Sequence, residues 1–158
     1  QSPYPHPINL NVLPHIDVLD VTGWSGEERK MIFETRKIMR LPHLEVAPTT
    51  VRVPVRVSHS ESVYARFRRP IDPQQARAVL SGAPGVVVLD EPAADRYPLA
   101  LDVAGRDEVF VGRIRQPEND DHALLIWVVS DNLRKGAATN AVQTAEMAVD
   151  AGLEGLSR

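Results

Sequence analysis

The chain has 158 residues, of which 43% are hydrophobic, and this suits one domain with its own core. Its net charge of −3 argues against a general nucleic-acid binder, and the absence of cysteine excludes disulfides, thiolate metal sites and a cysteine nucleophile within the chain. No apolar run approaches the ~20 residues that span a bilayer, and no signal-peptide pattern opens the chain, so we expect a cytoplasmic location.

The first residues predict an extended segment, because Pro3, Pro5 and Pro7 each disfavour helix in the residue before them. The chain begins with Gln1 rather than Met, and we therefore expect a piece of a longer protein. From Ile8 to Val12 apolar and polar residues alternate, which predicts a short strand.

A helix is expected from about Gly26 to Arg40. Ser25 and Glu28 have the spacing of a capping box, in which each side chain accepts a hydrogen bond from the other residue's backbone. Leu41-Pro42 should end this helix.

The middle of the chain predicts two strands and a short helix. Val51 to Val57 alternates cleanly, with Pro54 marking an edge or a bulge, and Ser62 to Arg69 follows as a second strand. Asp72-Pro73 then has the form of a helix start, and this helix should end near Gly82.

The last third predicts more strands and one long helix. The predicted strands are Gly85 to Asp90, Glu108 to Arg115 and His122 to Val129, and the last two should form a hairpin. Residues 91–107 are expected to be a loop. The helix should run from Asn132 to Leu153. Strands outnumber helices and mostly follow one another. The fold class is therefore α+β, with a mixed, largely antiparallel sheet and helices on one face.

Two basic side chains near the predicted strand are candidates for substrate binding and proton transfer. Arg52 offers a planar fork for a carboxylate, and His59 is a residue type that carries protons near neutral pH. A straight strand would separate them by roughly 23 Å, so one small substrate could reach both only if the chain bends between them, at Pro54 or at Ser58. The alternative is a solvated arginine and a turn histidine.

Glu34 and Lys37 are three apart and share a face of the first predicted helix. They could bind a zwitterionic ligand or simply form a surface ion pair. Asp131-Asn132 could cap the last helix, or its N-terminus could attract an anion or a carboxamide. No histidine has metal-ligand spacing, and the chain has no glycine-rich dinucleotide fingerprint, so we expect no metal site.

Read in order, the motifs of the chain resemble the C-terminal half of aspartate-semialdehyde dehydrogenase. The matching blocks span nearly the whole chain and are Ile8-Asn9-Leu10-Asn11-Val12-Leu13-Pro14-His15, Glu34-Thr35-Arg36-Lys37-Ile38, Val51-Arg52-Val53-Pro54-Val55 with His59-Ser60-Glu61, and Ser130-Asp131-Asn132-Leu133-Arg134-Lys135-Gly136-Ala137-Ala138 with Asn140 and Gln143. The resemblance implies the C-terminal domain of a glyceraldehyde-3-phosphate dehydrogenase-like fold. It also implies one domain over residues 1–158 for catalysis and dimerisation, without the N-terminal Rossmann domain.

The resemblance further implies an activity. The enzyme reduces L-aspartyl-4-phosphate to L-aspartate 4-semialdehyde with NADPH and releases phosphate, on the route to lysine (through diaminopimelate), threonine and methionine. In such a site Glu34 would bind the substrate amino group, Arg52 its carboxylate and Lys37 the phosphate. His59 would be the acid/base, and Asn132 would lie near the nicotinamide. We expect a homodimer, and we expect neither nucleic-acid nor membrane partners.

The chain also departs from the family pattern. The family nucleophile is a cysteine in the half that precedes this region, as is the NADP-binding domain, so the chain alone should be inactive and bind no NADP. The family often has glycine where this chain has Ser58, and cysteine at the position of Thr50. A non-catalytic paralogue and an oligomerisation module are the alternative interpretations.

Overall fold

The computed structural model describes residues 3–152, and the chain divides into two compact units, Gln1–Pro54 and Val55–Arg158. Each unit has its own set of hydrogen bonds.

The first unit is built on helix α1 (Gly26–Ile38) and confirms the predicted capping box. The Ser25 hydroxyl accepts from the Glu28 N–H at 3.1 Å, and a Glu28 carboxylate oxygen accepts from the Ser25 N–H at 2.9 Å. The other Glu28 oxygen accepts from the Thr50 N–H at 2.9 Å, which ties the helix start to a segment 22 residues further along the chain. Glu28 is consequently buried in a position where most helices expose an acidic residue.

Two predicted strands of this unit are wrong. Between Ile8 and Val12 the chain turns, with Leu10 at φ 54° and the Asn11 N–H bonded to the Ile8 carbonyl. From 51 to 57 only Arg52 pairs, through a single bridge to Leu13. Alternation of side chains therefore gave no strand here, because no neighbouring strand among residues 3–152 supplies a ladder of hydrogen bonds.

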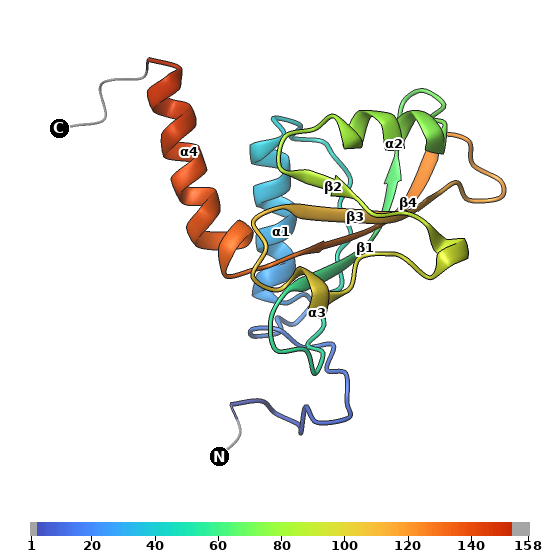
Figure 1. Ribbon diagram of the computed structural model, residues 1–158. Coiled ribbons are helices and arrows are strands. Elements are labelled where there is room, and N and C mark those ends of the chain that lie inside the picture. Colours follow the sequence, from blue (N-terminus) through green and yellow to red (C-terminus); the bar gives the residue numbers. More distant parts are fainter. Residues whose placement is uncertain (1–2, 153–158) are drawn as a thin grey trace. The chain divides into compact units, whose positions relative to one another are not determined.

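The second unit contains a four-stranded mixed sheet with the order β1-β4-β3-β2 (Figure 1). The strands are β1 (His59–Arg66), β2 (Val86–Val88), β3 (Val109–Arg115) and β4 (Ala123–Ser130). β4 pairs antiparallel with both β1 and β3, which confirms the predicted hairpin, while β2 pairs parallel with β3. The α+β class with a largely antiparallel sheet is confirmed, although β1 begins three residues earlier than predicted.

Helices cover the sheet on both faces rather than on one. Helix α2 (Pro73–Ser81), predicted correctly, contributes Ala76 to a core with Val111, Ile114 and Leu124. The one-turn helix α3 (Ala100–Val103) lies against the opposite face, where Val103 packs with Phe110 and Val129. The predicted loop 91–107 thus contains α3 and a 3₁₀ turn, η1 (Pro92–Ala94), both too short to produce a periodic pattern.

The end of the described chain is helical but not uniform. A π-helical segment, η2 (Arg134–Ala138), precedes α4 (Thr139–Asp150), and the predicted end of this helix at Leu153 lies outside the described residues. Helix α4 has no buried residue and projects away from the sheet of its unit (Figure 1). Within the described part of the chain, no helix is both long and apolar enough to cross a membrane.

Candidate functional site

Glu34 and Lys37 are both exposed on α1, as their spacing predicted. No ion pair joins them or engages either one among residues 3–152, so the interpretation as a surface ion pair is not realised. The Lys37 ammonium lies 6.0 Å from the centre of the Phe33 ring, at the outer limit of a cation–π contact. One anionic and one cationic group on this helix face are therefore open to a charged ligand.

Arg52 is half-buried in the same unit and is positioned by its backbone. Its N–H donates to the Leu13 carbonyl at 2.8 Å, and its own carbonyl accepts from the Leu13 N–H at 2.9 Å. The guanidinium stacks over the Tyr4 ring at 5.1 Å, and no carboxylate among residues 3–152 forms an ion pair with it. A planar cation held on an aromatic face retains free N–H donors for a carboxylate.

His59 begins strand β1 of the second unit, opposite Ser130 of β4. It is exposed, and its imidazole forms no hydrogen bond with the described residues. The residue before it, Ser58, has a φ of 81°, which is the left-handed conformation that glycine adopts readily and serine does not. The chain therefore bends at Ser58, immediately before His59.

Asn132, the residue expected near a nicotinamide, lies next to this bend. Its carboxamide oxygen accepts a hydrogen bond from the Ser58 N–H at 2.9 Å. The carboxamide nitrogen has no hydrogen-bond partner within residues 3–152 and is available to an acceptor on a ligand. This bond links Asn132 to the residue before His59 across 74 residues of sequence, and the pairing of His59 with Ser130 holds the same two segments side by side.

Asp131 fixes the start of the final helix and was only partly anticipated. Its carboxylate is buried, caps the helix by accepting from Leu133 N–H and Arg134 N–H, and also accepts from Gly105 N–H at 2.7 Å. These backbone donors, Gly105 first, hold the pKa of Asp131 below its ordinary value, so the carboxylate is ionised and anchors the segment that carries Asn132.

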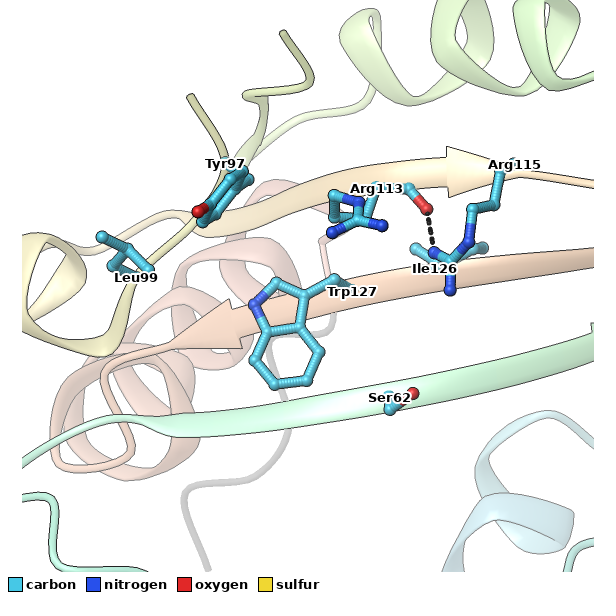
Figure 2. A pocket seen from close by; sticks show the side chains of 7 residues that line it. All are labelled: Ser62, Tyr97, Leu99, Arg113, Arg115, Ile126 and Trp127. Carbon is cyan, nitrogen blue, oxygen red and sulfur yellow. Dashed lines mark hydrogen bonds between the residues drawn. The ribbon is translucent and has the colours of Figure 1, made fainter. Parts of the chain in front are cut away.

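A second feature of this unit is a shallow hollow of about 280 Å³ on the α3 face of the sheet (Figure 2). Trp127 forms much of its floor, with the Trp127 indole N–H bonded to the Pro98 carbonyl at 3.0 Å. Arg113 and Arg115 lie along one side, at an irregularity in β3 where Asp90 accepts from the Arg113 N–H at 2.6 Å. Gly112 is required there, because a Cβ would lie 2.2 Å from the Leu89 carbonyl oxygen.

The residues missed from sequence are those that act through tertiary contacts. Ser58 was expected as a possible bend and as a departure from the family, but its contact with Asn132, and the hydrogen bond from the Gly105 N–H to Asp131, had no local signal. The described part of the chain has no cluster of acidic or histidine side chains that could hold a metal ion.

Comparison with known proteins decides the family. Residues 1–135 match the semialdehyde dehydrogenase dimerisation domain. This chain belongs to that family. Aspartate-semialdehyde dehydrogenases from Aquifex aeolicus and Legionella pneumophila are 52% and 50% identical to it, over 95% and 91% of the chain. The predicted resemblance is therefore confirmed.

Solved structures of the same family agree with the fold of this dimerisation domain. Aspartate semialdehyde dehydrogenase II from Vibrio cholerae, in complex with ASA, superposes with a TM-score of 0.89 at 40% identity and matches 95% of the chain. The Candida albicans enzyme with NADP gives a TM-score of 0.72 at 28% identity over 89% of the chain. The chain spans less than half of these relatives, 44% of the Aquifex and Vibrio proteins and 45% of the Candida protein.

Proposed function

We propose that the chain is the C-terminal catalytic and dimerisation domain, over residues 1–158, of an NADP-dependent aspartate-semialdehyde dehydrogenase. The protein would act in the cytoplasm on L-aspartyl-4-phosphate, in the biosynthesis of lysine, threonine and methionine. The observation that carries the proposal is the bond from the Ser58 N–H to Asn132. It links the cofactor candidate Asn132 to the residue directly before the acid/base candidate His59, in a chain that is 52% identical to a dehydrogenase of this kind.

The free charges of the first unit match the charges of this substrate. We assign Glu34 to the substrate ammonium, Arg52 to its carboxylate and Lys37 to its phosphate. A substrate with one cationic and two anionic groups requires one acidic and two basic side chains. Within residues 3–152, Glu34, Arg52 and Lys37 are not engaged in any ion pair. Their open state supports binding rather than a purely structural role.

His59 would hold and move the proton of the reaction. Its exposed imidazole is free to take a proton from an attacking group and to return it to a leaving group. The nucleophile itself lies outside this chain, which has no cysteine. Asn132 fits the cofactor assignment, because its free carboxamide N–H groups can orient an acceptor on NADP, which supplies the hydride chemistry when bound.

The proposal is tested with the protein encoded by the complete gene. L-Aspartate 4-semialdehyde, phosphate and NADP⁺ are supplied, and NADPH absorbance is followed. We expect turnover that requires both the semialdehyde and phosphate, with omission of each as control. A folded protein that gives no NADPH under these conditions would contradict the enzyme assignment and favour a non-catalytic member of the family.

We further propose a homodimer formed through the α3 face of the sheet, the surface defined by Ser62, Tyr64, Tyr97, Leu99, Leu125 and Trp127. Tyr64 on β1 and Leu99 directly before α3 are 55% and 48% exposed, so this surface presents apolar side chains to a partner. Arg113 and Arg115 at the hollow would give this surface polar specificity (Figure 2). Membership of a dimerisation-domain family supports an interface between copies of this chain.

A further inference from the structure

Ser58 combines three features that no other described residue shares. Its backbone has a φ of 81°, it is only 8% exposed, and its hydroxyl is the one buried side-chain polar atom among residues 3–152 without a hydrogen-bond partner. A serine in this conformation is disfavoured, and an unpaired buried hydroxyl adds to the cost. Some other interaction must therefore hold the turn in place.

Among residues 3–152, the one hydrogen bond from Ser58 to a distant segment runs from its N–H to the Asn132 carboxamide oxygen, at 2.9 Å. Asn132 is itself well anchored, since the adjacent Asp131 is 3% exposed and accepts three backbone hydrogen bonds. These bonds hold the start of the final helix in place. Ser58, the residue directly before His59, is bonded to this helix start through Asn132. This attachment acts together with the pairing of His59 opposite Ser130 to set how the chain enters β1.

We propose that Ser58 and Asn132 are a positioning pair for His59. The carboxamide oxygen of Asn132 holds the serine in its left-handed conformation, so that Asn132 serves the acid/base residue in addition to any ligand. This inference rests on the proposed role of His59 for its effect on turnover, but the bond and the turn can be tested without that role. The hydroxyl of Ser58 takes no part in the pair.

The test is a double-mutant cycle in the protein encoded by the complete gene. Asn132→Ala removes the acceptor, and Ser58→Gly supplies a residue that adopts positive φ without help. Amide hydrogen exchange at position 58, the NMR ring resonances of His59 and kcat are measured for each variant. Asn119→Ala, in the exposed turn between β3 and β4, is the matched control for loss of an asparagine and should leave all three readouts unchanged.

We expect Asn132→Ala to speed exchange at position 58 at least about tenfold, to shift the His59 resonances, and to lower kcat by about ten- to a hundredfold. Adding Ser58→Gly to Asn132→Ala should return the His59 resonances toward those of the unaltered protein and recover part of the lost kcat. A role of Asn132 confined to the cofactor predicts no such rescue.

Two results would overturn the positioning pair: unchanged exchange at position 58 in Asn132→Ala, or a double variant with no recovery of the His59 resonances. Should the unaltered protein fail to turn over the semialdehyde, the proposed function falls, while the exchange and resonance measurements still decide whether the pair exists.

Discussion

Ser58 is the residue at which local preference and tertiary structure disagree most clearly. Serine at positive φ costs about 1–2 kcal/mol, and a buried unpaired hydroxyl about 1–3 kcal/mol, whereas glycine costs about 0.5–1 kcal/mol in chain entropy. The conformation persists because Asn132 holds the Ser58 N–H from a distance of 74 residues in the sequence. No local pattern could have predicted this contact, although the departure from glycine correctly marked the turn as unusual.

Replacing this serine should therefore stabilise the protein. We expect Ser58→Gly to raise the free energy of unfolding by about 1 kcal/mol, measured by chemical denaturation. Ser60→Gly, two residues on within β1, is the control and should lower it by about 0.5–1 kcal/mol, because glycine weakens a strand. A Ser58→Gly variant less stable than the unaltered protein would show that the left-handed serine is not strained.

The assignment of Arg52 to the substrate carboxylate can be tested by a single substitution. In the complete protein Arg52→Lys should lower kcat/KM for the semialdehyde by about tenfold or more, because the planar fork and its stacking on Tyr4 at 5.1 Å are lost while the charge is kept. Arg56→Lys, an exposed arginine four residues along, is the control. Equal kcat/KM in Arg52→Lys and the unaltered protein would remove the carboxylate assignment.

At the scale of elements, sequence patterns succeeded where the determinants are local. The capping box fixed the start of α1, proline at the first helical position marked α2, and the turn between β3 and β4 was read from its residues. They failed at 8–12 and 51–57, where alternation is present but no partner strand is, and at α3, which has only four residues. Alternation of apolar and polar residues shows that a segment could present one apolar face, whereas a strand also requires a neighbouring strand for its hydrogen bonds.

The N-terminal cap of α1 should make the stability of the first unit depend on pH. The Ser25 N–H, and after it the Thr50 N–H, hold the pKa of Glu28 below its ordinary value of 4.5. A lowered folded-state pKa means that the contribution is complete above pH 4.5 and is lost as the pH falls through the folded-state value.

Glu28→Gln removes this dependence. The difference in melting temperature between the unaltered protein and Glu28→Gln should be large at about pH 7 and should narrow as the pH is lowered toward about 3. Glu27→Gln is the matched control, since the Glu27 side chain is 41% exposed and lies 3.8 Å from Lys30 in a surface pair, and it should change little at either pH. A difference that stays constant with pH would contradict the role given to the carboxylate.

For the whole molecule, the proposed dimer requires that the α3 face of the sheet be buried between two copies of the chain. Leu99→Asp, within the α3-face surface, should convert the dimer to monomer by burying an unpaired charge, as measured by light scattering. Val79→Asp, 73% exposed on α2 at the opposite face, is the control and should remain dimeric. A dimer that survives Leu99→Asp, or one lost equally in both variants, would place the interface elsewhere.

We propose His59, at the entry to β1 and directly after the Ser58 that bonds to Asn132, as the acid/base of a semialdehyde dehydrogenase. The most direct measurement is kcat for the phosphate-dependent oxidation of L-aspartate 4-semialdehyde by His59→Gln in the complete protein, beside His43→Gln as an exposed control. We expect kcat to fall by about a hundredfold or more in His59→Gln and to stay unchanged in His43→Gln. Equal kcat values for the two variants would contradict it.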